Sequence, residues 1–218
     1  MATASPPKPK RKSSIQDLFF LKRRPRLRGV SMEWDPPPDD AAYQKLLNDE
    51  GFVSNDYWKD DDINNHPIIA QDLADLEQYL LPTFFEFSQK SKYFQNQFYL
   101  FQWVFIWGAF FTTVLGALAS IFYYLSNSAT GTVEAGLSTQ QLFSYLTAIV
   151  GAITAFITAL SNRGEPLKRW GKTRRLAEEL RMNYFNYLSH LPPFDKPDRV
   201  QKLRESVIDI RVKEQENA

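Results

Sequence analysis

The chain has 218 residues, a formal net charge of +1 and 44% hydrophobic residues, values that alone would describe an ordinary soluble protein of one or two domains. It contains no cysteine, which excludes disulfides, thiolate metal sites and cysteine nucleophiles. Charge and hydropathy are nevertheless divided into blocks along the chain. The average composition hides this, because the charged ends offset a middle that carries almost no charge.

Residues 1–32 form a basic arm that we expect to be disordered, since it combines many Lys and Arg residues and several prolines with a single acid, Asp17. Near an anionic leaflet each basic residue contributes about 1 kcal/mol, so contact with anionic lipid is one interpretation. A solvated tail, a nuclear-import or nucleic-acid patch and an organelle transit peptide are the alternatives. Phe19 and Phe20 favour a membrane or a protein partner over nucleic acid.

Residues 33–67 carry a net negative charge and form an acidic, proline-rich segment. We expect one short helix in it, near residues 41–47. Asp60, Asp62 and His66 offer oxygen and imidazole ligands to a metal. The run lacks the glycine and distal glutamate of a calcium loop and the paired histidines of a zinc protease. We therefore expect a solvated loop without a metal or any other cofactor.

Residues 68–97 are predicted to form a cytoplasmic helix that leads into a membrane span, with a break or kink at Pro82. Between Tyr93 and Arg163 the only Lys, Arg, Asp, Glu or His is Glu134. A spanning helix needs about 20 mostly apolar residues, so this region is long enough for two. The sequence predicts a transmembrane helix over residues 98–125, an external loop over residues 126–140 and a second transmembrane helix over residues 141–162.

Basic residues flank the outer ends of the two predicted spans, at Lys90 and Lys92 before the first and at Arg163 and Lys168 after the second. By the positive-inside rule, both termini are then cytoplasmic and the loop is external, in the cell membrane or an inner membrane. We expect Glu134 to lie at the external mouth of the hairpin.

Small residues recur along both predicted spans at a spacing that lets helices approach closely. In the first span they are Gly108, Thr112, Gly116 and Ser120, and in the second they are Ala148, Ala152, Ala155 and Ala159. The second span also carries a polar seam, which consists of Ser144, Thr147, Gly151, Thr154, Thr158 and Ser161. Hydroxyls aligned through a bilayer either pack between helices or line a wet lumen. Two helices are too thin to enclose a pore, so a lumen requires a ring of several copies.

The chain after the second span is predicted to form an amphipathic cytoplasmic helix over residues 163–191, followed by a terminal helix and tail over residues 192–218. Apolar positions repeat by three, four or seven, which is typical of helices that pack side by side. His66 and His190 are the only histidines, and neither has a catalytic partner at a motif spacing. We therefore expect no enzymatic activity.

The predicted cytoplasmic helix over residues 163–191, called the return helix below, carries a cluster that consists of Arg174, Ala177, Glu178, Leu180 and Tyr184. This cluster follows a close hairpin and a first helix that is rich in aromatic residues. Over residues 70–191 this combination resembles the SLATT superfamily (SMODS- and SLOG-associating two-TM effectors) of small two-span membrane proteins. The resemblance implies a pore-forming effector of a bacterial conflict system, of a kind often encoded beside nucleotide-producing or nucleotide-sensing partners. We expect no sensor domain, and the basic arm and acidic segment lie outside the shared region.

The sequence therefore predicts an all-α membrane protein, with a two-helix transmembrane hairpin extended by long cytoplasmic helices, that assembles as a homo-oligomer in the lipid bilayer. The first hypothesis for its function is an ion-conducting pore or channel-like effector, with the second span lining the lumen. The alternative is a non-conducting membrane anchor or accessory subunit that docks a protein partner through its cytoplasmic helices and charged arms.

Overall fold

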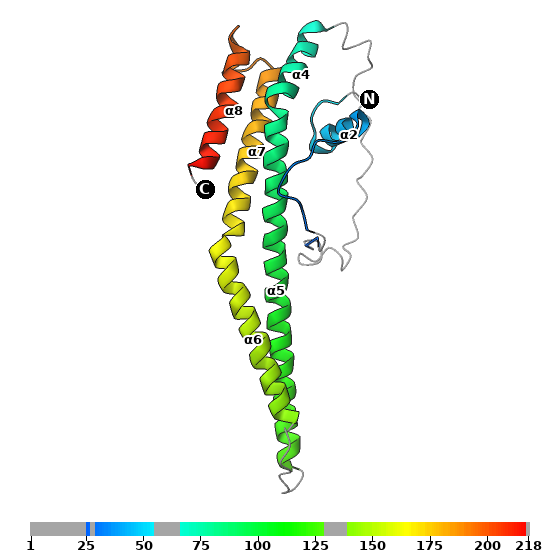
Figure 1. Cartoon of the computed structure of the whole chain (residues 1–218), viewed down its shortest axis with the longest axis vertical. Coiled ribbons are helices and arrows are strands. Elements are labelled where there is room, and N and C mark those ends of the chain that lie inside the picture. The colour runs from blue at the N-terminus through cyan, green and yellow to red at the C-terminus, as the bar shows by residue number, and fades with distance from the viewer. Residues whose placement is uncertain (1–24, 27–28, 55–65, 129–138, 217–218) are drawn as a thin grey trace, which may run out of the picture. The chain divides into compact units, whose positions relative to one another are not determined.

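The computed structural model describes residues 25–26, 29–54, 66–128 and 139–216. The helices in these ranges, shown in Figure 1, are α2 (Asp40–Glu50), α4 (Pro67–Tyr79), α5 (Leu81–Ser128), α6 (Thr139–Gly164), α7 (Pro166–Leu188) and α8 (Arg199–Gln215). No strand occurs in the described ranges, so the prediction of an all-helical chain is confirmed for them. Most of the basic arm and most of the predicted external loop, Glu134 included, lie outside the described residues.

The chain divides into two compact units. The hairpin unit contains the second part of α5, from Gln97, and the whole of α6, to Gly164. The helical domain contains Arg28–Asn96 and Glu165–Ala218, and therefore α2, α4, the first part of α5, α7 and α8.

The ends of the helices in the helical domain follow from local sequence. A carboxylate oxygen of Asp39 accepts a 2.7 Å hydrogen bond from the backbone N–H of Ala42 and caps α2, which ends at Gly51 in a left-handed conformation with φ 78°. Pro67 is the first residue of α4, where a missing N–H costs no helical bond. Pro82 is the second residue of α5, so the break between α4 and α5 falls just before this proline.

The core of the helical domain is aromatic and draws side chains from each of its helices. Phe52, which follows α2, is 2% exposed, and its ring centroid lies 4.7 Å from that of Phe84 on α5 and 4.6 Å from that of Tyr184 on α7. Complete burial of such a side chain contributes about 1.5–3 kcal/mol. The end of α2 is therefore packed into the domain, although the sequence predicted a mainly solvated acidic segment.

The boundary between α6 and α7 is set by a proline. Glu165 has φ 42° and ψ 45°, in the left-handed region, and Pro166 begins α7. A residue before proline is disfavoured in the right-handed helical region, so the helix cannot continue regularly through Glu165. The return helix consequently begins at residue 166 rather than at residue 163.

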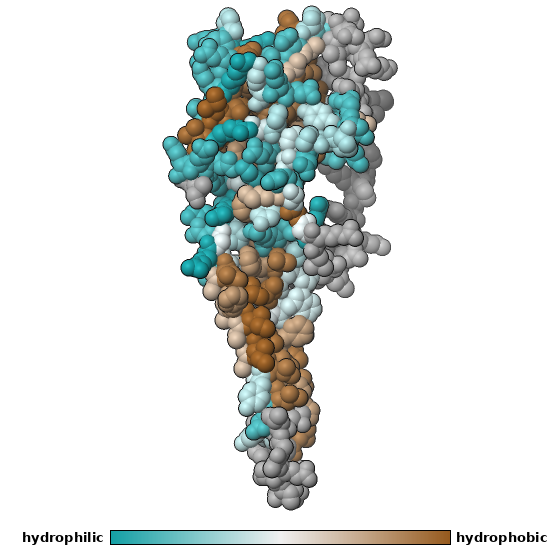
Figure 2. Space-filling view, in the orientation of Figure 1, coloured by the Kyte–Doolittle hydropathy of each residue, from teal (hydrophilic) through white to brown (hydrophobic). Residues whose placement is uncertain are grey.

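Two helical stretches, Leu81–Leu125 and Gln141–Leu188, are long and apolar enough to cross a membrane, as judged by length and composition. In the most apolar 18 residues of these stretches, only 6% and 0% of the residues are buried. The core helix of a soluble protein would have most of these residues buried. Figure 2 shows the hydrophobic side chains exposed over the described part of the hairpin unit.

Candidate functional site

The polar seam of α6 is divided between two surroundings. Thr147, Gly151, Thr154 and Ser161 are half-buried, on the face of α6 that contacts α5. Ser144 and Thr158 are exposed. The seam that the sequence presents as continuous therefore contributes partly to packing inside one copy of the chain and partly to its outer surface.

The two helices approach closely where Gly108 of α5 meets Thr154 of α6. Gly108 is buried, and a Cβ atom added to it would lie 2.4 Å from Oγ1 of Thr154. Only glycine fits here without a shift of the threonine. Nearer the end of the hairpin, the rings of Phe122 and Phe143 stack with centroids 5.3 Å apart and planes inclined by 10°.

Hydroxyl groups of both helices bond within their own helix. Thr147 donates to the carbonyl oxygen of Phe143, Thr154 to that of Val150 and Thr158 to that of Thr154, each at 2.8 Å. On α5, Thr112 and Ser120 donate to the carbonyl oxygens four residues before them. These bonds satisfy one hydrogen-bonding group of each side chain without water or a second helix.

The outer surface of α6 has a bulky half and a small half. The bulky half consists of apolar side chains that are 45–65% exposed, namely Tyr145, Ile149, Ile153, Phe156 and Leu160. The small half consists of exposed residues with short side chains, namely Ser144, Ala148, Ala152, Ala155, Thr158 and Ala159. The alanine stripe, expected to pack closely against another helix, thus lies away from α5 within one copy of the chain.

The small residues of α5 differ in their surroundings. Thr112 and Gly116 are half-buried and Ser120 is exposed. A Cβ atom on Gly116 would have no heavy atom of a neighbour within 4 Å, in contrast to Gly108. Of these two glycines of α5, only Gly108 lies against a side chain of α6.

The residues of α7 that carry the family resemblance are part of an amphipathic helix. Ala177, Leu180 and Tyr184 are buried in the core of the helical domain. Burial raises the pKa of Tyr184 to about 12, and its hydroxyl oxygen accepts a 3.3 Å hydrogen bond from the backbone N–H of Val53. Arg174 and Glu178 are paired on the surface at 2.6 Å. The buried members of the cluster hold α7 in the domain, and the pair of Arg174 and Glu178 lies within α7 itself.

A buried carboxylate on α4 joins three elements of the helical domain. Asp72 is 1% exposed, and it lies 2.6 Å from Arg199 of α8 and 2.8 Å from Nε2 of His190, which follows α7. His190 thus has an ionisable partner that no motif spacing in the sequence identifies. Its partner is 118 residues away in the sequence and forms no motif with it. A sequence signal existed, since Asp72 interrupts the apolar face of α4 that leads to the buried Leu76.

A second acid, Asp75, lies one turn further along α4. Tyr187 of α7 donates a 2.9 Å hydrogen bond from its hydroxyl to Asp75. Burial and the carboxylate of Asp75 raise the pKa of Tyr187, because both disfavour the phenolate. Asp72 and Asp75 of α4 thus both stabilise the contact of α4 with the end of α7.

Glu50 at the end of α2 forms a third polar cluster of the helical domain. Its carboxylate lies 2.8 Å from Nζ of Lys92 on α5 and 2.9 Å from the guanidinium of Arg181 on α7. Burial on its own would raise the pKa of Glu50, but the hydrogen bond and charge of Lys92, with the charge of Arg181, outweigh it and lower the pKa. The cluster fastens α2 to two other helices.

No group of three or more His, Cys, Asp or Glu residues that could hold a metal ion occurs in the part of the chain that the structure describes. Asp60 and Asp62 lie outside that part, and His66 directly precedes α4.

Residues 86–202 match the family described as "Protein of unknown function (DUF4231)". The matched range extends from the first part of α5 to the beginning of α8. It includes the second apolar stretch, all but the first five residues of the first, and the residues of the α7 cluster. No curated protein and no solved structure matches the chain.

Proposed function

The chain belongs to the DUF4231 family, and from this premise we propose that it is a homo-oligomeric, two-span integral membrane protein whose second span, α6, lines an ion-conducting pore. The observation that carries the proposal is the division of the outer surface of α6 into a bulky half and a small half.

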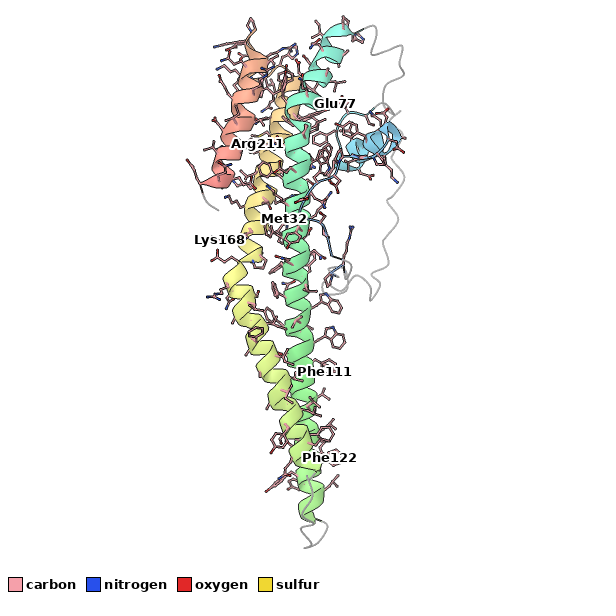
Figure 3. All side chains as sticks on the ribbon, in the orientation of Figure 1. Met32, Glu77, Phe111, Phe122, Lys168 and Arg211 are labelled. Carbon is pink, nitrogen blue, oxygen red and sulfur yellow. The ribbon has the colours of Figure 1, made fainter. Side chains whose placement is uncertain are left out.

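Membrane insertion is supported by the apolar residues that the hairpin unit exposes. On α5, Phe110 and Phe111 are 52% and 47% exposed, and Phe111 and Phe122 are labelled in Figure 3. Apolar surface left in water costs about 25 cal/mol per Å², so a lipid surrounding stabilises this arrangement. The basic residues outside the two spans favour a cytoplasmic location for both termini.

Assembly into a ring is supported by the small half of α6. Lipid tails solvate bulky apolar side chains well, whereas short side chains let a neighbouring helix or a water column approach closely. The bulky half of α6 and the exposed Phe110 and Phe111 of α5 then face lipid, and the small half of α6 faces the ring axis and the adjacent copy. The exposed hydroxyls of Ser144 and Thr158 contribute to the lumen, while Thr147 and Thr154 pack inside each copy.

The ion preference of such a pore follows from its lining. Hydroxyl and methyl groups without fixed charge discriminate weakly among small ions. A ring of Glu134 carboxylates at the external mouth would favour cations. The resemblance to SLATT effectors supports the same class of activity.

Three consecutive residues of α6 test the pore at one depth. Ile153, Thr154 and Ala155 point about 100° apart, toward the bulky half, α5 and the small half, respectively. Because the chain has no native cysteine, Ile153→Cys, Thr154→Cys and Ala155→Cys are each the only thiol in the protein.

In planar-bilayer recordings, a charged thiol reagent should block current through Ala155→Cys and leave the other two variants conducting. The proposal is refuted if the purified oligomer passes no current, or if the reagent blocks Ile153→Cys and not Ala155→Cys. In that second case the bulky half lines the lumen.

The second candidate function is a non-conducting membrane anchor that docks a protein partner. The observation that favours it is the internal satisfaction of the seam, because Thr147, Thr154 and Thr158 bond to their own helix and need no water. Cross-linking in native membranes separates the two candidates. A ladder of identical copies supports the pore, and a single copy joined to an unlike protein supports the anchor.

A further inference from the structure

A basic groove of about 550 Å³ lies in the helical domain, between the first half of α7 and the end of α8. Lys168, labelled in Figure 3, is in the first turn of α7 and lines this groove. The other basic lining residues are Arg169, Lys172, Arg175 and Lys213, and the acidic ones are Glu165 and Glu179. The lining thus has a formal excess of three positive charges.

Not all of this charge is neutralised inside the protein. Lys213 pairs with Glu179 at 2.7 Å and Lys168 with Glu165 at 3.1 Å. Arg175 forms no ion pair with any residue that the structure describes, and the same is true of Arg169, whose guanidinium lies over the ring of Phe94, 5.9 Å from its centroid. A ring contact leaves the positive charge of Arg169 in place. Two guanidinium groups therefore remain in the groove for an anion.

The chemistry of the groove suits a phosphate group. Guanidinium groups bind phosphate oxygens through two parallel N–H donors, which gives both charge and geometry. The volume is within the range of small-molecule sites, about 300–1,000 Å³, and exceeds what a lone inorganic ion needs.

The position of these residues in the chain indicates the source of the phosphate. An extended chain advances at most about 3.6 Å per residue, so connectivity alone keeps Lys168 within about 14 Å of Gly164, the last residue of α6. Clusters of Lys and Arg immediately outside a span on the cytoplasmic side are typical of anionic-lipid binding. Here the cluster surrounds a groove rather than lying on a flat face.

We propose that this groove binds the phosphate headgroup of an anionic lipid. The inference rests on the membrane insertion of α6 in the proposed function and does not depend on a pore. It assigns to the folded residues of α7 and α8 the lipid contact that the sequence suggests for the basic arm.

The test uses the full-length protein in a non-ionic detergent and isothermal titration calorimetry. The probes are short-chain phosphatidic acid, phosphatidylcholine of the same chain length and glycerol phosphate, the soluble counterpart of the first headgroup. Phosphatidic acid should bind, and the other two should bind at least tenfold more weakly.

Variants locate the site. Removing one basic residue from an anionic-lipid contact costs about 1 kcal/mol, which is about fivefold in affinity. Arg175→Gln should therefore weaken binding of phosphatidic acid about fivefold, and the Arg169→Gln/Arg175→Gln double variant about 30-fold. The matched control is Arg174→Gln/Lys202→Gln, which removes the same charge from exposed ion pairs outside the groove and should change affinity less than twofold.

Each contrary result overturns the inference. An equal loss in the control variant shows an effect of net charge only, and tight binding of glycerol phosphate identifies a soluble ligand instead of a lipid. If the double variant fails to fold by circular dichroism, Arg175→Gln alone decides, since its side chain forms no ion pair within the described part of the chain. Binding of phosphatidic acid without conductance would refute the pore and support this site. Conductance without binding of phosphatidic acid would support the pore and refute this site.

Discussion

The contact between Gly108 and Thr154 predicts a specific loss of stability in the variant Gly108→Ala. The new Cβ atom would lie 2.4 Å from Oγ1, 3.0 Å from Cγ2 and 3.3 Å from Cβ of Thr154. The threonine cannot rotate freely, because its hydroxyl is bonded to the carbonyl oxygen of Val150 and β-branched side chains have few rotamers in a helix. Overpacking of this kind costs about 1–3 kcal/mol, and the higher helix propensity of alanine returns about 1 kcal/mol. We expect a net loss of up to about 2 kcal/mol.

The assay is unfolding of the detergent-solubilised protein by sodium dodecyl sulfate, followed by circular dichroism. Gly116→Ala is the matched control, since it makes the same substitution in the same helix with no neighbouring atom within 4 Å of the new methyl group. This control should be as stable as the wild type or up to about 1 kcal/mol more stable.

A double variant separates the steric effect from other causes. Thr154→Ala removes Oγ1 and Cγ2, which leaves the two Cβ positions 3.3 Å apart. Gly108→Ala/Thr154→Ala should therefore be at least about 1 kcal/mol more stable than the sum of the single effects. If Gly108→Ala is as stable as Gly116→Ala, α5 and α6 do not approach each other at this point and the packing described for the hairpin is wrong.

Three further predictions concern the helical domain. Asp72→Ala leaves Arg199 without its buried carboxylate and should lower the free energy of unfolding by about 3 kcal/mol. Denaturant unfolding measures this, and an unchanged midpoint would contradict the ion pair between Asp72 and Arg199. Because the pKa of Glu50 is lowered in the folded state, its stabilising effect is present above the ordinary value of 4.5 and is lost as pH falls through the folded pKa. In Glu50→Gln the unfolding free energy should be lower at neutral pH, with Lys92 unpaired, and should fall less on acidification than in the wild type. Gly171→Ala, with no atom within 4 Å of the added Cβ, should raise the unfolding free energy by about 0.5–1 kcal/mol, and a loss would reveal an unseen contact.

The long apolar helices could be predicted from the sequence because the signal is local. The lack of charge on either side of Glu134 predicts two helices long and apolar enough to cross a membrane, and the structure contains two such stretches. Pro82 and Pro166 mark helix starts through the absence of an N–H group. These properties belong to single residues or short runs, so no tertiary information is needed.

The division of the polar seam could not be predicted, because it depends on the rotation of α6 about its own axis. Thr154 and Thr158 are both hydroxyl residues at the same spacing, yet one is packed beside Gly108 and the other is exposed. Neighbouring positions of a seam differ by tens of degrees around the helix, and the sequence does not fix where the partner helix lies.

The polar clusters of the helical domain were missed for a different reason. Glu50 and Arg181 are 131 residues apart, and Asp72 and Arg199 are 127 residues apart. Pairs at such separation follow from tertiary packing, and a single sequence contains no spacing that identifies them. Only the presence of the acids Asp72 and Asp75 beside the apolar residues of α4 indicates that partners are needed.

The two ends of α8 are held by interactions that respond differently to salt. At its start, Arg199 meets the buried Asp72, and a buried ion pair is screened only weakly. Toward its end, Arg211 pairs with Glu86 at the surface, where mobile ions compete. Raising the ionic strength therefore frays α8 from its C-terminal turn inward, and amide deuterium uptake should rise there first while the amides around Leu203 stay protected.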